Sequence, residues 1–271
     1  MTKIIQISDP HIVPSGQLAY GRVDTAKALA NCVETINRTL PQLGIVDMAF
    51  VSGDLTDFGT PEEYELFQTI MEPLQIPYRA IPGNHDDVEK MRHAFSDQGW
   101  MPKSGPINWT AEFDDLVLIG LDTSVTSKAH GHLSPISLDY LENQLARLGP
   151  MPVIVATHHP PIITGIEKMD IQNLRESDRF KMILSNHPNE VRLVCGHIHR
   201  SIVAPFGSII CHISPGVSHA VSMDQRHRVP NCLTMEPGSF LMHENRNGIF
   251  THTIPVGEFD GPYLFYPEKD R

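Results

Sequence analysis

Gly83-Asn84-His85-Asp86 follows residues 76–82, a short apolar run that predicts a strand ending at a turn. Loops at strand ends, held by a rigid scaffold, often carry binding or catalytic groups. The glycine lets the backbone turn closely, and the amide oxygen of Asn84 can bind a metal ion without adding charge. Taken alone, the tetrapeptide is equally consistent with an ordinary turn. Its interpretation therefore depends on the other strand ends of the chain.

Four other apolar runs also end in polar clusters. The clusters are Asp9-Pro10-His11, Ser52-Gly53-Asp54, His158-His159-Pro160-Pro161 and Gly196-His197-Ile198-His199. Taken singly, the first is more typical of a turn, the second is a common strand exit, and the third could be a rigid loop with one core histidine. The fourth is the most specific, because two alternating histidines have little structural reason to follow a buried strand. Their joint occurrence, each time at the end of an apolar strand, indicates a dinuclear metal site.

The side chains of these clusters combine carboxylate or amide oxygens with imidazoles. The candidate ligands are Asp9, His11, Asp54, Asn84, His158, His197 and His199. Such a set suits Fe, Mn, Zn or Co better than Ca. It is too large for one open catalytic site but suits two metal ions that share a bridging carboxylate. The spacing of two in Asp9-x-His11 and in His197-x-His199 predicts that each pair points to one side of an extended segment.

Segments with helical periodicity lie between the predicted strands. Asp24 is the expected N-cap of a helix that continues to residue 40, and Thr60 opens a capping box with Pro61 at the first helical position. Ser137 is the expected cap of a further amphipathic helix. Largely apolar strands that alternate with helices predict an α/β fold whose sheets are covered by helices.

The last third of the chain has a different pattern. Residues 201–212 predict a strand or hairpin, and residues 249–254 predict a final strand. Residues 213–248 are rich in Pro, Gly, Met and His, and we expect a cap or oligomerisation insertion there, within a single domain spanning residues 1–271. Met223, Met235 and Met242 are expected to pack at this cap or at a subunit contact. We therefore expect a homodimer or a higher homo-oligomer.

Composition limits the classes of function. The 271 residues include 41% hydrophobic and 20% charged residues, as in an ordinary globular protein. The net charge of -11 argues against an extended nucleic-acid surface, and bound metal ions could supply the positive charge that a phosphate substrate needs.

The four cysteines form no CxxC pair; Cys195 and Cys211 are expected to be buried thiols, with a disulfide left open. Neither a signal peptide nor a membrane span is visible, so a cytoplasmic location is expected.

Taken in order, the five clusters resemble the calcineurin-like metallophosphoesterase superfamily over residues 1 to about 200. The branch they resemble contains class III cyclic nucleotide phosphodiesterases and bacterial glycerophosphodiesterases. The resemblance implies a four-layer α-β-β-α sandwich. It also implies that Asp9, His11 and His199 bind one metal, that Asn84, His158 and His197 bind the other, and that Asp54 bridges them. His158 takes the ligand role by alignment, although His159 could be confused with it.

The same resemblance implies hydrolysis of a small phosphodiester, such as a glycerophosphodiester or a 3′,5′-cyclic nucleotide, by attack of a metal-bound hydroxide. His85 would contact the phosphoryl oxygen or assist the leaving group, and Asp86 would orient a histidine. His219 is a candidate substrate contact, as is the loop around His130-Gly131-His132. The alternatives are a phosphomonoesterase or nuclease of the same superfamily and, in another class, a non-catalytic scaffold.

Overall fold

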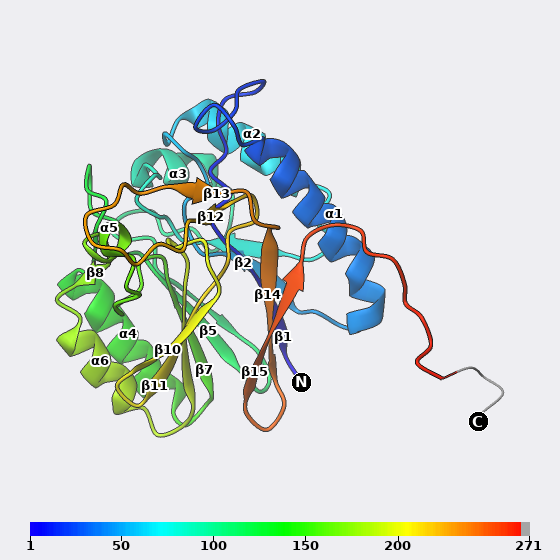
Figure 1. The fold of residues 1–271 in the computed structure, drawn as a ribbon. Helices are drawn as coiled ribbons and strands as arrows, with labels where there is room; N and C mark the ends of the chain where they lie inside the picture. Colours follow the sequence, from blue (N-terminus) through cyan, green and yellow to red (C-terminus); the bar gives the residue numbers. More distant parts are fainter. Residues whose placement is uncertain (267–271) are drawn as a thin grey trace.

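The computed structural model describes residues 1–266, which form two packed β-sheets covered by helices (Figure 1). In the order of pairing, the first sheet contains β15 (Ile249–Pro255), β14 (Ser239–Asn245), β1 (Lys3–Ile7), β2 (Met48–Val51) and β3 (Tyr78–Ala80). The second contains β10 (Ile202–Phe206), β11 (Ile209–Ile213), β9 (Val191–Cys195), β7 (Val153–Thr157), β5 (Val117–Leu121) and β4 (Trp109–Glu112).

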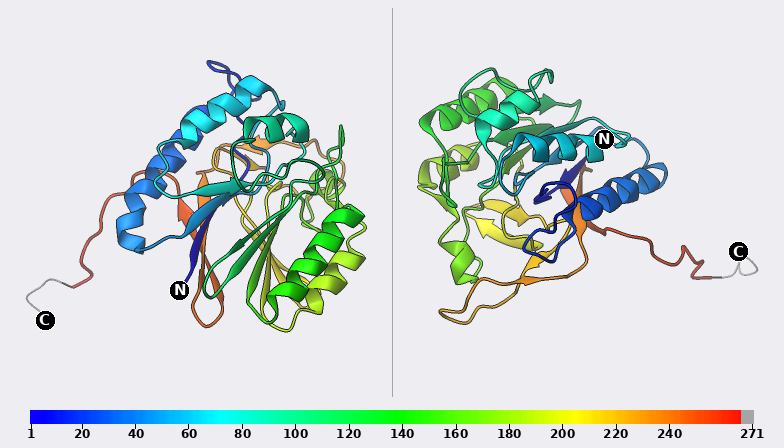
Figure 2. Two further views of the ribbon diagram at one scale, coloured as in Figure 1. Left: turned by 180° about the vertical axis from the view of Figure 1, so that it is seen from behind. Right: turned by 90° about the horizontal axis from the view of Figure 1, so that it is seen from above.

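Helices cover the outer face of each sheet, which gives four layers (Figures 1 and 2). On the first sheet lie α1 (Thr25–Leu43), α2 (Pro61–Met71) and α3 (Val88–Ala94), and on the second lie α4 (Pro135–Leu148) and α6 (Asp178–Ser185). One apolar cluster joins the inner faces of both sheets to α1 and α2, and a second fills the space beneath α4 and α6. The expected four-layer sandwich is confirmed. No helix within residues 1–266 combines the length and apolar character needed to cross a membrane.

Capping side chains set the helix starts near the site. Asp24 accepts a hydrogen bond from the amide of Lys27 at 3.0 Å, and Thr60 and Glu63 form the predicted reciprocal capping box. The expected cap at Ser137 is wrong: Ser134 caps α4 and accepts from the Ser137 amide at 3.1 Å. Pro135 then occupies the first turn, where its missing amide hydrogen is tolerated.

Parallel pairing aligns the ends of the central strands. β1, β2 and β3 run parallel in the first sheet, and β5, β7 and β9 run parallel in the second. The side-chain amide of Gln6 in β1 donates to the carbonyl of Cys195 in β9 at 3.0 Å, which connects the two sheets just before their carboxyl ends. Loops that leave these ends therefore enter one common crevice, where α/β proteins commonly bind ligands.

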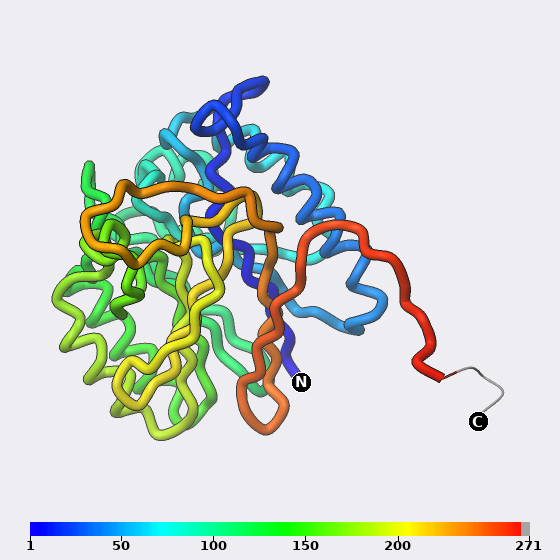
Figure 3. The backbone as a smooth tube through the Cα atoms, viewed as in Figure 1, coloured from blue at the N-terminus to red at the C-terminus, as the bar shows by residue number. Residues whose placement is uncertain are grey.

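The expected insertion at 213–248 is wrong at its C-terminal boundary. Residues 239–245 are β14, which pairs antiparallel with β1 and β15 inside the first sheet. Met242, expected at a cap or subunit contact, is a buried core residue of this strand. Ahead of it, residues 214–238 carry the short pair β12 (Ala220–Val221) and β13 (Leu233–Thr234), and the chain path places them above the strand ends (Figures 1 and 3). Whether this segment acts as a cap or a subunit contact stays a prediction.

Two short elements complete the rim of the crevice. These are the pair β6 (Gly131–His132) with β8 (Leu174–Arg175), and the single-turn helix α5 (Glu167–Asp170).

The cysteines follow the expectation: Cys195 and Cys211 are buried free thiols, so the disulfide that the sequence left open is not formed.

Candidate metal centre

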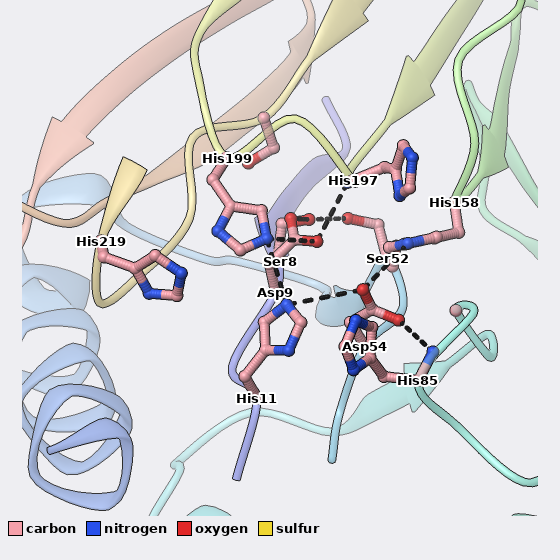
Figure 4. A network of polar contacts seen from close by, with 12 residues as sticks. Ser8, Asp9, His11, Ser52, Asp54, His85, His158, His197, His199 and His219 are labelled. Atoms are coloured by element: carbon pink, nitrogen blue, oxygen red, sulfur yellow. Dashed lines mark hydrogen bonds and ion pairs between the residues drawn. The ribbon is translucent and has the colours of Figure 1, made fainter. Parts of the chain in front are cut away.

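Five loops bring the predicted ligands to the crevice at the strand ends (Figure 4). They follow β1, β2, β3, β7 and β9 and carry Asp9, His11, Asp54, Asn84, His158, His197 and His199. Among the histidines of the set, each is at least nine-tenths buried, as are both aspartates. Buried imidazoles and carboxylates in such numbers require partners, because unpaired polar groups inside a protein are costly.

Asp9, His11 and His199 form one group whose ligand atoms all lie within 4.8 Å of one another. Nε2 of His11 is 3.1 Å from Nε2 of His199, and that nitrogen is 3.4 Å from Oδ1 of Asp9. Figure 4 shows these three side chains pointing toward one another. Their assignment to the first metal ion stays a prediction, and this proximity favours it.

Asp54 occupies the space between the first group and His158. Its Oδ2 is 3.4 Å from Nε2 of His11 and 3.2 Å from Nε2 of His158. The side-chain oxygen of Asn84 is 3.3 Å from the same His158 nitrogen. The bridging role of Asp54 stays a prediction, and the contact of one carboxylate oxygen with ligands of both groups favours it.

His158, His159 and His197 form a further group with ligand atoms within 4.8 Å. The carbonyl of Ser52 accepts a hydrogen bond from Nδ1 of His158 at 2.8 Å, which directs Nε2 of that ring toward Asp54. His159 instead places its Nδ1 2.8 Å from the hydroxyl of Thr123. The choice of His158 over His159 as ligand stays a prediction, which is favoured by the contact of His158 with Asp54.

The backbone that presents the ligands is not extended. Asp9, His11, Asp54, His197 and His199 have φ angles of 55°, 48°, 50°, 72° and 52°, in the left-handed region. Residues other than glycine adopt this region at an energetic cost, and such strain is often found at functional sites. The spacing argument from extended segments is therefore wrong in its mechanism. Left-handed turns, not strand alternation, aim each Asp-x-His or His-x-His pair.

Two motif glycines allow close approach of these loops. A Cβ atom on Gly53 would overlap the His158 ring, and one on Gly83 would overlap the carboxylate of Asp54. Gly53 also has a φ of +101°, which side chains rarely tolerate. The absence of a side chain at these two positions lets adjacent loops place Asp54 and His158 in contact.

Electrostatics separate the charged members of the site from the neutral ones. Burial alone would raise the pKa of Asp54, but the adjacent His158 and His85 hold it well below its usual range. Burial opposes protonation of His158, yet the carboxylate of Asp54 raises the pKa of this imidazole to about 9. For His197 and His199, burial and then neighbouring imidazoles lower the pKa well below its ordinary value. Neutral imidazoles are the form that binds metal ions.

Unpaired nitrogens show that the site fits metal ions. Nε2 of His159, Nε2 of His197 and Nδ1 of His199 are buried without a hydrogen-bond partner in the part of the chain that the structure describes. Native proteins pair nearly all buried polar atoms, so such exceptions point to a missing partner. For His197, a metal ion bound at Nε2 would supply it, and the residue lies in the group with His158 and His159.

Comparison with known proteins agrees with this geometry. The family model described as calcineurin-like phosphoesterase matches residues 2–201. The chain belongs to this phosphoesterase family. The resemblance inferred from the five clusters is thereby confirmed.

Curated relatives narrow the branch of the phosphoesterase family. A probable glycerophosphodiester phosphodiesterase GpdQ from Arcobacter nitrofigilis is 38% identical over 98% of this chain and 97% of its own. Glycerophosphodiester phosphodiesterase GpdQ from Enterobacter lignolyticus is 30% identical over 97% of this chain and 94% of its own. A cAMP/cGMP dual specificity phosphodiesterase from Mycobacterium tuberculosis is 28% identical over 94% and 79%. The branch expected from the sequence agrees with these relatives.

Solved structures agree with the fold. A dimetal phosphatase from Danio rerio superimposes with a TM-score of 0.61 at 12% identity, covering 94% of this chain and 99% of the other. At this identity the likeness concerns the fold alone.

The phosphoesterase site contains one carboxylate that the sequence reasoning missed. Asp57 is buried, and its Oδ1 is 3.0 Å from Nδ1 of His11 and 3.4 Å from Nδ1 of His85. It also accepts a hydrogen bond from the Tyr20 hydroxyl at 3.1 Å. The available signal was its position three residues after Asp54, on the same strand-end loop. Burial would raise the pKa of Asp57, but His11 and His85 bring it far below its usual range.

The expected role of Asp86 as a carboxylate that orients a histidine is wrong. Its oxygens accept from the amides of Gly83, Leu55 and Thr56 at 2.9–3.2 Å, and from the hydroxyls of Thr56 and Tyr64. Asp86 thus ties the Asn84 loop to the Asp54 loop. Nothing in these contacts assigns it a catalytic role.

A cavity of about 290 Å³ opens onto the ligands and is lined by His85 and His219. The carbonyl of Asp57 accepts a hydrogen bond from Nδ1 of His85 at 2.9 Å, which leaves the other nitrogen of His85 for a ligand. The His219 ring lies 4.6 Å from the His199 ring, centre to centre. Its role as a substrate contact stays a prediction. His130 and His132 are absent from the described residues that line the cavity.

Proposed function

We propose that the protein is a metal-dependent phosphodiesterase whose substrates are small phosphodiesters, with glycerophosphodiesters first and 3′,5′-cyclic nucleotides second. The position of Asp54 between His11 and His158 carries the proposal, because it supplies one shared ligand to two groups of ligands. The order of substrates rests on the 38% identical relative named for glycerophosphodiesters and the 28% identical relative named for cyclic nucleotides.

The ligands would hold two transition-metal ions. Asp9, His11 and His199 would bind one, Asn84, His158 and His197 the other, and Asp54 both. The donor set of oxygens and imidazoles suits Fe, Mn, Zn or Co. When bound, such a pair of ions neutralises phosphate oxygens and makes a nucleophilic water available near neutral pH.

The protein's own side chains orient the substrate. His85 lines the cavity, and its Nδ1 is fixed by the carbonyl of Asp57. Its Nε2 can therefore hydrogen-bond a phosphoryl oxygen or give a proton to the departing alkoxide. His219 faces the same space from the 214–238 segment and can contact a second phosphoryl oxygen. The reaction needs no serine or cysteine nucleophile, so a single in-line attack is expected.

The test is a substrate panel on purified protein whose metal content has been measured. Glycerophosphodiesters, cyclic AMP and bis(p-nitrophenyl) phosphate should be hydrolysed, and p-nitrophenyl phosphate should be a much poorer substrate. Higher kcat/KM for the monoester would instead indicate a phosphomonoesterase, and inactivity of metal-loaded protein would favour the scaffold alternative. A chiral phosphorothioate diester should react with inversion; retention would show a covalent intermediate.

Assembly and location complete the proposal. We expect a homodimer or higher homo-oligomer, supported by Met223 and Met235, which expose 56% and 59% of their surface on the 214–238 segment. Light scattering tests this, and a monomeric mass would contradict it. The cytoplasmic location predicted from the sequence stays a prediction that cell fractionation can check. An extended nucleic-acid ligand is not expected at a net charge of -11.

A further inference from the structure

The cavity above the metal ligands has a second wall that the chemistry does not use. This wall, which we call the amide wall, consists of Met169, Gln172, Val221, Asn231, Cys232 and Leu233. It comes from two segments, one around α5 and the other between β12 and β13. The same cavity is also lined by His85 and by several of the predicted ligands.

Contacts between the two segments hold the amide wall in place. The amide of Arg228 donates to a carboxylate oxygen of Glu167 at 2.8 Å, and the same oxygen lies 3.0 Å from Nδ1 of His227. The side-chain amide of Gln225 donates to the carbonyl of Thr164 at 3.1 Å. Residues shortly before Gln172 are therefore connected to residues shortly before Asn231, and both carboxamides line the same cavity.

The polar groups of the amide wall are neutral acceptors. The side-chain NH₂ of Gln172 donates to the carbonyl of Lys168 at 2.9 Å, and that of Asn231 donates to the sulfur of Met169 at 3.1 Å. Within the described residues, neither side-chain oxygen accepts a hydrogen bond. Both oxygens therefore remain for a hydroxyl donor.

The charges that the amide wall lacks are also informative. Among the described residues lining the cavity there is no Lys or Arg, and the one carboxylate is Asp54 at the metal ligands. A second phosphate would need a cation, and an ammonium group would need a carboxylate or an aromatic cage. The wall instead combines two carboxamide oxygens with the apolar side chains of Met169, Val221 and Leu233, which suits an uncharged carbon chain with hydroxyl groups.

We propose that Gln172 and Asn231 are specificity-determining residues that bind the hydroxyls of a glyceryl group through their side-chain oxygens. This inference rests on the proposed function and deepens it. It places the glyceryl group against the amide wall and directs the second alcohol of the diester, whatever its charge, toward the open side of the cavity. Headgroup charge should then matter little to turnover, whereas loss of the glyceryl hydroxyls should matter.

The first experiment compares Gln172→Met and Asn231→Leu with wild-type protein in its metal-loaded form. For glycerophosphocholine, each variant should raise KM about tenfold, the equivalent of one lost hydrogen bond. Kcat/KM for bis(p-nitrophenyl) phosphate, which has no hydroxyl groups, should stay within about twofold of wild type. Gln75→Met is the control, since Gln75 is exposed and does not line this cavity. Equal losses on both substrates, or no loss on glycerophosphocholine, would overturn the proposal.

A second experiment does not depend on turnover. Cys232 is an exposed thiol on the amide wall, whereas Cys32, Cys195 and Cys211 are buried, so iodoacetamide should label Cys232 selectively. Glycerol 3-phosphate should slow this labelling more than methyl phosphate does, and the Gln172→Met/Asn231→Leu double variant should lose the difference. Equal protection by the two phosphates in wild-type protein would refute the glyceryl site. If protection is seen but glycerophosphocholine is not hydrolysed, the proposed function fails while this inference stands.

Discussion

Oδ1 of Asp57 lies 3.0 Å from Nδ1 of His11, and both side chains are buried. The other ring nitrogen of His11 faces His199 and Asp54. A carboxylate on the far nitrogen of an imidazole ligand fixes the orientation of the ring and raises its basicity. Asp57 therefore supports the metal centre from behind, although it is not among the seven predicted ligands.

Asp57→Asn should weaken metal binding and lower kcat/KM by about 10–100-fold, because the amide can no longer hold His11 as a carboxylate does. Metal affinity measured by competition with a chelator, together with diester hydrolysis, checks this. Asp114→Asn, at an exposed residue outside the site, is the control and should behave as wild type. Unchanged metal affinity in the Asp57 variant would show that Asp57 supports His85 and not the metal ligand His11.

Gly83→Ala should disrupt the metal centre because the added methyl group has no space, and not because the backbone is strained. Its Cβ would overlap the Asp54 carboxylate, and Gly83 has no positive φ. We expect loss of at least one metal ion per chain and about a 100-fold fall in kcat/KM, since a small displacement of a catalytic group has effects of this size. Metal analysis and kinetics provide the measurement. Gly99→Ala is the matched control, because a Cβ there meets nothing within 4 Å. Similar behaviour of the two variants would mean that Asp54 can move without harm.

Most of the site could be predicted from the sequence because its residues follow apolar strands directly. Asp54 and His158 occur at strand exits, and parallel strands bring their exits together. Asp57 was missed because its role depends on a loop that folds back beneath His11, which periodicity does not describe. The geometry of Asp9 and His11 was predicted for the wrong reason, since left-handed backbone rather than strand alternation directs them.

One strand of the first sheet that escaped prediction is β14. Its sequence, Ser239–Asn245, contains His243 and Glu244, polar residues that normally indicate exposed positions. Both are buried because specific partners satisfy them: His243 contacts Gln6 and Thr251, and Glu244 pairs with Arg246 and His252. Such long-range pairing is invisible in a local pattern, so the sequence predicts part of an insertion there instead of a strand.

His243 should make stability fall in acid. Burial, with smaller effects of His212 and Arg192, lowers its pKa to about 3, whereas an unfolded histidine titrates near 6.5. The neutral form stabilises the folded state fully above about pH 6.5. Below that pH the unfolded chain takes up a proton that the folded chain does not, so stability falls by up to about 1.4 kcal/mol per pH unit until about pH 3.

Urea unfolding of wild type and His243→Gln at about pH 8 and about pH 5 measures this contribution. The difference in unfolding free energy between the two pH values should be larger for wild type than for the variant. Titration of the metal ligands is common to both proteins and cancels in the comparison. His93→Gln, at an exposed histidine of α3, should keep the wild-type pH dependence. An equal pH dependence of the unfolding free energy in the His243 variant and in wild type would show that His243 has the same protonation in the folded and unfolded states.

Removing the metal ions should lower thermal stability. Asp9 and Asp54 are both at least 98% buried, and burial and the charge of Asp54 raise the pKa of Asp9. Bound cations would offset the burial of these carboxylates and pair the open Nε2 of His197. A ligand present at about 100 times its Kd stabilises a protein by about 2.7 kcal/mol, which corresponds to several degrees in Tm for a chain of this size. Chelator-treated protein should therefore melt lower, and added Mn²⁺ or Zn²⁺ should restore Tm in a concentration-dependent way. Asp54→Asn should show a much smaller response because it lacks the shared ligand, whereas an equal response to metal in this variant would place the stabilising ions elsewhere.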